Sequence, residues 1–195
     1  MKIIIARHGE TEENKAGILQ GHIPGQLSRL GIEQAKKLAL RLKDEKIDYI
    51  YSSDLARAID TAEEISTYHP KTPLEPTQEL REMDLGKFTG RQKSELETNN
   101  QTFVVGSSYD DPGVESRADL HGRAERFVKD IMAKHPDATV LLVGHSGINR
   151  NLVSVITGER VENIPAQLNT SVNIFEIDAD GGYRTEAANC IKHLD

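Results

Sequence analysis

The residues best suited to chemistry in this chain come directly after its first apolar run. Lys2-Ile3-Ile4-Ile5-Ala6 is short, apolar and β-branched, which is typical of a buried strand, and Arg7-His8-Gly9-Glu10-Thr11 follows it. A guanidinium, an imidazole and a glycine that lets the backbone approach a ligand would suit attack on a phosphate. A strand ending in a polar turn would read the same way, so this motif needs support from the rest of the chain.

A second histidine follows a second apolar run far along the chain. Leu141-Leu142-Val143 leads into Gly144-His145-Ser146-Gly147, after which a helical pattern begins. Ligands of open parallel sheets bind beyond the carboxyl ends of the strands, so we expect His8 and His145 to converge on one crevice. A single histidine is more often structural, and it is the matching position of the pair that favours a shared site.

Several further motifs accompany these two. They are Asn14 with Gly17 and Gln20-Gly21, Ser52-Ser53-Asp54-Leu55-Ala56-Arg57-Ala58 with Thr61-Ala62, Leu80-Arg81-Glu82 with Gly86 and Gly90, and Gly113-Val114-Glu115-Ser116. In this order, and over residues 2 to about 194, the set closely resembles the histidine phosphatase superfamily of phosphoglycerate mutase-like proteins. The Arg7-His8-Gly9 triplet corresponds to the RHG motif of that family.

The resemblance implies a role for each matching residue. His8 is the implied nucleophile, forming a phosphohistidine, with its second ring nitrogen donating to the carbonyl of Gly9. Arg7 and Arg57 would clamp phosphoryl oxygens, because a planar guanidinium matches phosphate geometry, and His145 would donate as an imidazolium when phosphate is bound. The remaining implied phosphate-binding residues are Asn14, Gln20, Gly21 and Ser146, the last through its backbone amide at a helix start. From the residues alone, we would expect Arg57 to be a solvated helix arginine and Asn14 to be a turn residue.

Glu82 is the implied general acid, protonating the leaving oxygen and then activating water. Glu79 and Asp84 lie close by, and spacing alone does not choose among the three carboxylates. The family pattern Leu-x-Glu before Gly86 selects Glu82. No metal and no cofactor are implied, since the remaining histidine near these motifs, His22, lies in a Gly/Pro-rich loop without ligand spacing around it.

The elements that must position these residues alternate along the chain. We expect strands at 2–6, 49–52, 139–143 and 171–177, a short edge strand at 74–77, and helices from Ser28 to about Lys46, from Asp54 to Glu64 or Tyr68, from about Ser116 to His135, and from Ile148 to Thr157. Asp180-Gly181-Gly182 predicts an antiparallel hairpin. The pattern indicates an α/β protein, a three-layer α/β/α sandwich with a mostly parallel sheet and an antiparallel edge, as in the resembled family.

Length, net charge and cysteine content limit the classes of protein to which this chain can belong. With 195 residues, a net charge of −7 and one cysteine, Cys190, we expect a single domain over 1–195, in the cytoplasm, with no internal disulfide. Neither a basic stripe nor a long apolar run indicates nucleic acid or membrane as a partner. A small phosphorylated metabolite is the expected partner, and the oligomeric state cannot be read from the sequence.

The segment at about 91–116 is the expected lid or insertion, and it bears on the reaction. From Ser94 to Ser116 it contains no lysine or arginine, whereas mutases of the resembled family hold the carboxylate of phosphoglycerate with arginines here. This favours a metal-independent phosphomonoesterase over a cofactor-dependent phosphoglycerate mutase. A non-catalytic phosphate-binding module is the third possibility, which the complete set of motifs argues against.

Overall fold

The fold is built on one six-stranded sheet, in the order β3-β2-β4-β1-β5-β6. The computed structural model describes residues 1–96, 113–178 and 180–195. The strands β1 (Lys2–Arg7), β2 (Tyr49–Ser53), β3 (Leu74–Thr77) and β4 (Thr139–Gly144) are parallel, and β5 (Val172–Ile177) and β6 (Tyr183–Cys190) run antiparallel beside β1. The prediction of a mostly parallel sheet with an antiparallel edge is confirmed, as is the edge position of 74–77.

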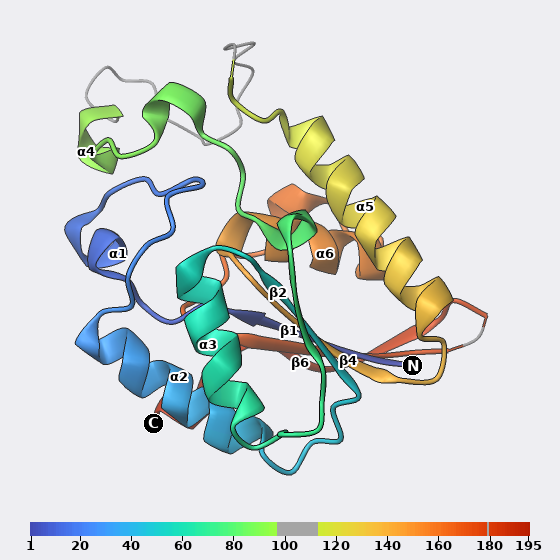
Figure 1. Ribbon diagram of the computed structural model, residues 1–195. Coiled ribbons are helices and arrows are strands. Elements are labelled where there is room, and N and C mark those ends of the chain that lie inside the picture. Colours follow the sequence, from blue (N-terminus) through green and yellow to red (C-terminus); the bar gives the residue numbers. More distant parts are fainter. Residues whose placement is uncertain (97–112, 179) are drawn as a thin grey trace.

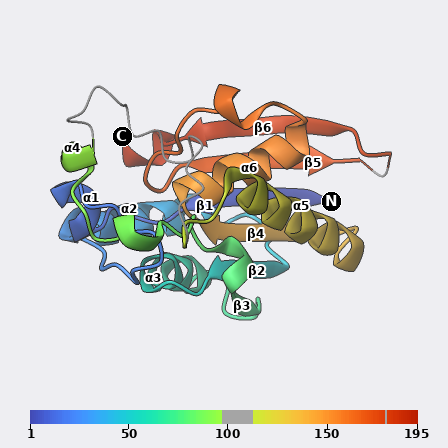
Figure 2. The same ribbon diagram turned by 90° about the horizontal axis from the view of Figure 1, so that it is seen from above.

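Helices cover both faces of this sheet. Figures 1 and 2 show α2 (Arg29–Leu42) with α3 (Ala56–Ser66) on one side, and α5 (Arg117–Lys134) with α6 (Ser146–Thr157) on the other. Because side chains alternate along a strand, Ile4 and Ala6 of β1 pack with α2 and α3, whereas Ile3 and Ile5 pack with α5 and α6. The expected three-layer sandwich is therefore present.

Local signals in the sequence set the ends of these helices. Ser28 caps α2 by accepting from the amide of Gly31 at 3.0 Å, and Ser116 caps α5 by accepting from the amide of Asp119 at 3.0 Å. Gly158 ends α6 in the left-handed conformation, with φ of 71°. The helix α2 ends four residues before the predicted Lys46, since residues 43–45 form a turn.

The hydrophobic pattern did not reveal several short elements of the structure. The helix α1 (Glu12–Ala16) has only five residues and is closed by a capping box between Thr11 and Asn14. The others are α4 (Lys93–Leu96) and the 3-10 turns η1 (Gln78–Leu80), η2 (Gly86–Phe88), η3 (Val161–Asn163) and η4 (Lys192–Leu194).

The start of α2 packs directly on the loop after β1. A Cβ on Gly9 would lie 2.5 Å from the Gly31 carbonyl oxygen, and one on Gly31 would lie 1.9 Å from the Glu10 carbonyl oxygen. Gly9 does not adopt a positive φ. It is therefore the close backbone packing against Gly31, rather than a special turn, that excludes a side chain at Gly9.

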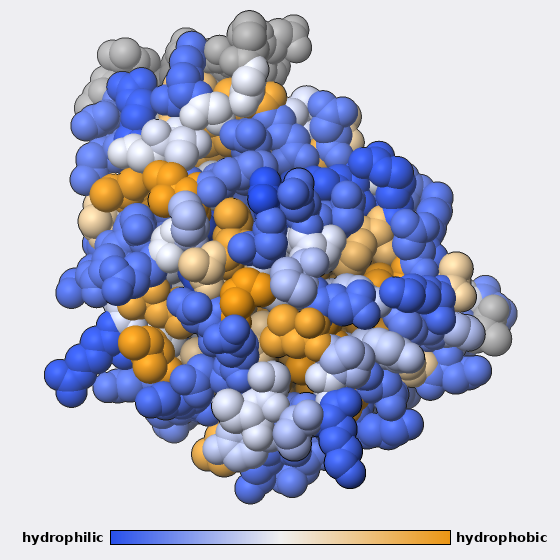
Figure 3. Space-filling model, viewed as in Figure 1, coloured by the Kyte–Doolittle hydropathy of each residue, from blue (hydrophilic) through white to orange (hydrophobic). Residues whose placement is uncertain are grey.

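The segment that the sequence marks as a lid, 91–116, is only partly covered, because 97–112 lies outside the described residues. In the parts of the chain that are described, no helix is both long and apolar enough to cross a bilayer. Figure 3 shows hydrophilic residues over most of one face, interrupted by apolar areas that include exposed residues of α2.

Candidate active site

His8 follows β1 and is 2% exposed. Its Nδ1 lies 2.6 Å from the carbonyl oxygen of Gly9. A carbonyl can only accept, so Nδ1 carries the proton and the lone pair of the neutral ring is on Nε2. Burial, and then the charges of Arg7 and Arg57, hold the pKa of His8 well below its ordinary value of 6.5. The ring is therefore a neutral nucleophile of defined tautomer at neutral pH.

His145 stands beside His8 because β1 and β4 are parallel neighbours. The register pairs Arg7 with Gly144, so the residues that follow each leave the sheet at the same level. The two imidazole centroids are 5.0 Å apart, and the His8 amide donates to the Gly144 carbonyl at 3.0 Å. The two strand ends thus bring His8 and His145 together, as expected from the sequence.

The ring of His145 is neutral in this arrangement. Arg57 Nε donates to its Nδ1 at 3.1 Å, and its Nε2 lies 2.9 Å from the hydroxyl of Ser53. Burial, with Arg57 as the strongest of the nearby charges, holds the pKa of His145 well below 6.5. The imidazolium suggested by the family would require the Arg57 contact to break, since a protonated Nδ1 cannot accept.

Arg57 lies in the first turn of α3, as expected, but it is buried rather than solvated. Its NH1 donates to the carbonyls of Ile23 and Pro24, and its NH2 donates to that of Gly21 at 3.0 Å. Desolvation lowers its pKa to about 10, which still leaves it charged at neutral pH. Four of its five N–H groups thus have acceptors, counting the one on His145, and the second N–H of NH2 has none among the described residues.

Arg7 keeps more of its donors available than Arg57 does. Its NH1 donates to the carbonyl of Gln167 at 2.6 Å, and its buried Nε has no hydrogen-bond partner among the described residues. Burial lowers the pKa of its guanidinium without removing its charge. Of the two guanidiniums, Arg7 is better able to bind a tetrahedral anion with paired donors.

The carboxylate of Glu82 rests on the N-terminus of α6. It accepts from the amides of Met83 at 3.0 Å, Gly147 at 3.0 Å and Ile148 at 3.3 Å. The N-cap residue of α6, His145, makes no side-chain capping bond, so Glu82 supplies the negative group that this helix end favours.

Among the three carboxylates that the sequence left open, Glu82 is the one whose charge acts on both Arg7 and Arg57, opposing the fall in their pKa. Asp84 instead lies 3.6 Å from His22 Nδ1 and accepts from the amide of Gly86. The position of Glu82 relative to the two guanidiniums agrees with the family pattern.

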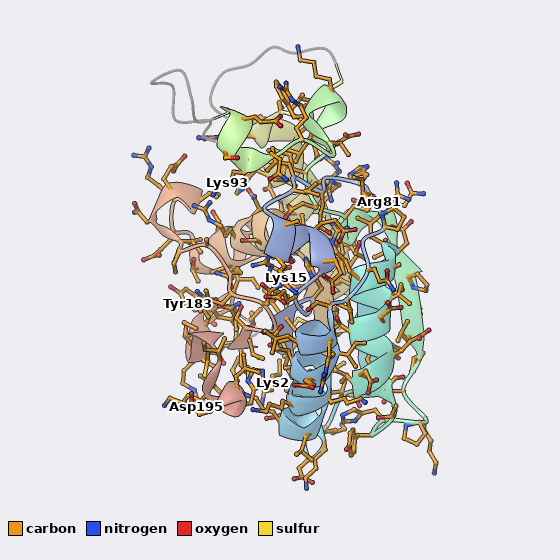
Figure 4. All side chains as sticks on the ribbon, turned by 90° about the vertical axis from the view of Figure 1, so that its left-hand side faces the viewer. Lys2, Lys15, Arg81, Lys93, Tyr183 and Asp195 are labelled. Atoms are coloured by element: carbon orange, nitrogen blue, oxygen red, sulfur yellow. The ribbon has the colours of Figure 1, made fainter. Side chains whose placement is uncertain are left out.

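The loop of Glu82 is also fixed to the turn between β2 and α3. Arg81 makes two bonds to the carboxylate of Asp54, at 2.7 and 2.6 Å, and this pairing holds the pKa of Asp54 below its usual range. Figure 4 labels Arg81 on the loop after β3. His22, which the sequence analysis set aside, donates from Nε2 to the carbonyl of Glu82 at 2.9 Å.

The remaining predicted residues lie around this centre. Asn14 Oδ1 accepts from the amide of Thr11 and from Asn169 Nδ2, which leaves the Nδ2 of Asn14 as its donor. Gln20 is buried, and its Oε1 has no hydrogen-bond partner in the described part of the chain. Gly21 acts through the carbonyl that receives Arg57, and Ser146 Oγ accepts from the amide of Gln167 at 3.1 Å.

Sequence reasoning missed several residues that hold the site together. Thr61 Oγ1 accepts from the Gly9 amide at 3.1 Å and donates to the Arg57 carbonyl at 2.8 Å. Asn169 Nδ2 donates to the His8 carbonyl at 3.2 Å. Ser53 and Thr61 belong to a motif noted above, which could have found them, whereas the loop of Gln167 and Asn169 carries no periodic or charge signal.

Comparisons with known proteins agree with this geometry. The family model of the histidine phosphatase superfamily (branch 1) matches residues 3–190. Phosphoglycerate mutase-like protein 4 of Arabidopsis thaliana is 33% identical, over 100% of this chain and 87% of its own length. The metal-independent phosphoserine phosphatase of the same plant is also 33% identical, over 99% and 83%. The structure of Bacillus stearothermophilus YhfR has a TM-score of 0.89 and 26% identity, covering 100% of this chain and 99% of its own.

Proposed function

This chain belongs to the histidine phosphatase superfamily and is a phosphatase of it, and we propose that it hydrolyses small phosphorylated metabolites through a phosphohistidine on His8. The observation that carries the proposal is the His8 ring itself. Its Nδ1 is bound to Gly9 at 2.6 Å, its Nε2 keeps a lone pair, and two guanidiniums lie close enough to lower its pKa. A neutral nucleophile inside a cationic pocket is what attack on a phosphate dianion requires.

In the first step, Nε2 of His8 forms a bond to phosphorus while the ester P–O bond breaks. Arg7 binds equatorial oxygens with its remaining donors, and Arg57 contributes its charge and one N–H. Glu82 acts here in its carboxylic acid form, in place of the carboxylate that the α6 amides bind in the free site, and gives its proton to the leaving alkoxide. The products of this step are the free alcohol, phosphohistidine and the Glu82 carboxylate.

In the second step, water attacks phosphorus and the P–N bond breaks. The Glu82 carboxylate takes a proton from the water, which returns Glu82 to the acid form and restores the neutral ring of His8. His145 donates to phosphoryl oxygen when its ring is free of Ser53 or Arg57. Asn14 and the amide of Ser146 are the neutral donors that we assign to the bound phosphate, with Gln20 and Gly21 forming its wall.

Two variants test these roles against the wild type in a screen of phosphorylated metabolites. His8→Ala should release no phosphate from any ester. Glu82→Gln should lose most turnover yet retain radiolabelled phosphate on His8 after denaturation, because the nucleophile is intact. Unchanged turnover of Glu82→Gln would move the acid role to Glu79 or Asp84.

Phosphatase rather than mutase chemistry is supported by the lack of lysine and arginine between Ser94 and Ser116. The metal-independent phosphoserine phosphatase among the relatives supports a reaction without a metal and a small phosphorylated substrate. Incubation with phosphoglycerate distinguishes the two, since a mutase would isomerise it and a phosphatase would release inorganic phosphate. A module without activity would bind phosphate and release no alcohol.

We further propose that residues 1–195 form one catalytic domain with an insertion at about 91–116. One sheet covered on both faces, with a site assembled from residues 7 to 169, supports this assignment. We also propose that the protein is located in the cytoplasm. Its one cysteine, Cys190, is a free thiol, as is usual under the reducing conditions there.

A further inference from the structure

The loop that carries Glu82 is held by an arginine that the proposed mechanism does not use. Arg123 lies in the second turn of α5, and its side chain is 13% exposed. Its NH1 donates to the carbonyls of Glu79 at 2.7 Å and Arg81 at 2.9 Å, and its NH2 reaches that of Glu82 at 3.5 Å. A single guanidinium thus contacts three carbonyls within four residues of one loop.

Glu115 fixes this guanidinium from its other side. Its carboxylate accepts from Nε of Arg123 at 3.0 Å and from NH2 at 2.8 Å, and it also accepts from the amide of Asp84 at 3.2 Å. The Glu115 amide donates to the Asp84 carbonyl at 2.8 Å. All five N–H groups of Arg123 therefore have acceptors, and every one of them lies on Glu115 or on the loop of Glu82.

The two ends of Glu82 are consequently attached to two different helices. Its carbonyl faces Arg123 of α5, and its carboxylate rests on the amides of Gly147 and Ile148 in α6. The helices pack together through Leu120 and Ala124 of α5 in the same core as α6. The helices α5 and α6 form one packed layer. The position of Arg123 in α5 therefore fixes the position of the Glu82 loop relative to the first turn of α6.

We propose that Arg123 is a positioning residue for proton transfer by Glu82, and this inference rests on the proposed function of Glu82. It acts through the loop backbone and not by contact with substrate. Lysine cannot replace it, because an ammonium group has three donors and no planar fork to join Glu115 to the carbonyls. A displacement of about 1 Å in a catalytic group costs on the order of 100-fold in rate.

The test compares Arg123→Lys with Arg126→Lys, a matched change of an exposed arginine on the same helix. Single-turnover rates with enzyme in excess measure cleavage of the ester bond alone. An alkyl phosphate needs a proton on its leaving oxygen, whereas a nitrophenyl phosphate releases a stable phenolate without one. Thermal unfolding midpoints and inorganic phosphate binding confirm that each variant is folded with an intact pocket.

We expect Arg123→Lys to cleave the alkyl phosphate on the order of 100-fold more slowly and the nitrophenyl phosphate within about 3-fold of the wild type. Glu115→Gln, which weakens the same contact without changing the arginine, should show the same selectivity to a smaller extent. Arg126→Lys should match the wild type with both esters. Equal losses on both esters, or no loss on either, would overturn the role of Arg123.

Wild type and Glu82→Gln in the same assay separate this inference from the proposed function. If Glu82→Gln shows no preference between the two esters, Glu82 is not the acid, and its proposed role fails together with the inference about Arg123. If Glu82→Gln loses the alkyl ester selectively while Arg123→Lys does not, only the inference about Arg123 fails.

Discussion

Replacing Gly147 by alanine should remove most turnover and leave the fold intact. A Cβ at this position would lie 2.3 Å from Oε1 of Glu82 and 3.1 Å from its Cδ. Heavy atoms in such contact separate to at least 3.0 Å, so the carboxylate must retreat by about 0.7 Å or more. The side chain of Glu82 would leave the amides of Gly147 and Ile148, which donate to it at 3.0 and 3.3 Å.

The expected magnitudes differ for activity and stability. A displaced proton donor should lower kcat about 10- to 100-fold for an alkyl phosphate. For stability, alanine gains about 1 kcal/mol over glycine inside a helix, and loss of the carboxylate cap of α6 costs about 1 kcal/mol. The two changes nearly cancel, so the thermal midpoint should move by only a few degrees.

The assay measures kcat and the thermal midpoint of Gly147→Ala beside Gly122→Ala. A Cβ on Gly122, inside α5, would meet only the end of the flexible Arg126 side chain, at 3.4 Å. The control should therefore keep wild-type kcat with equal or higher stability. Wild-type turnover in a folded Gly147→Ala protein would refute the placement of Glu82 as proton donor.

Three further predictions concern the support, the charge and the chemistry of the site. Thr61→Val leaves the Gly9 amide without its acceptor, so urea unfolding should show a loss of about 1–3 kcal/mol, and an unchanged unfolding free energy would contradict this role. The pKa of His8 and of His145 is held well below 6.5, so the folded chain binds fewer protons than the unfolded chain under mildly acidic conditions. The contribution of these two histidines to the free energy of unfolding should therefore be fully present above about pH 6.5 and should be lost as the pH falls below it. The acid limb of kcat/KM should also lie below about pH 6.5. A rate profile that is flat from about pH 4 to 9 would count against the scheme. Activity should survive exhaustive treatment with a chelator, and a loss that a divalent ion restores would oppose a metal-independent reaction.

Hydrophobic periodicity and cap residues were sufficient to predict the main elements of the fold. The strands at 2–6, 49–52 and 139–143 and the helix starts at Ser28 and Ser116 follow from short-range patterns that depend little on the rest of the chain. The five-residue helix α1 was missed because it is too short for a hydrophobic face and depends on the capping box of Thr11 and Asn14.

The reason why position 9 requires a glycine was also misjudged from the sequence. The local motif suggested freedom of the backbone near a ligand, but the actual constraint is Gly31, which packs against Gly9 from the start of α2. No local pattern connects residues more than twenty positions apart, so such a pairing becomes visible only when α2 is placed on the loop.

The sequence by itself determined that His8 and His145 lie at the same edge of the sheet. Parallel strands bring the ends of β1 and β4 to one edge, and a glycine follows or precedes each of the two histidines. Only the tertiary structure decided their protonation and hydrogen bonding. The neutral ring of His145 depends on Arg57, the site of Glu82 depends on the amides of α6, and the loop of Glu82 depends on Arg123. These states are set by desolvation and by donors from distant segments, which no spacing along the chain encodes.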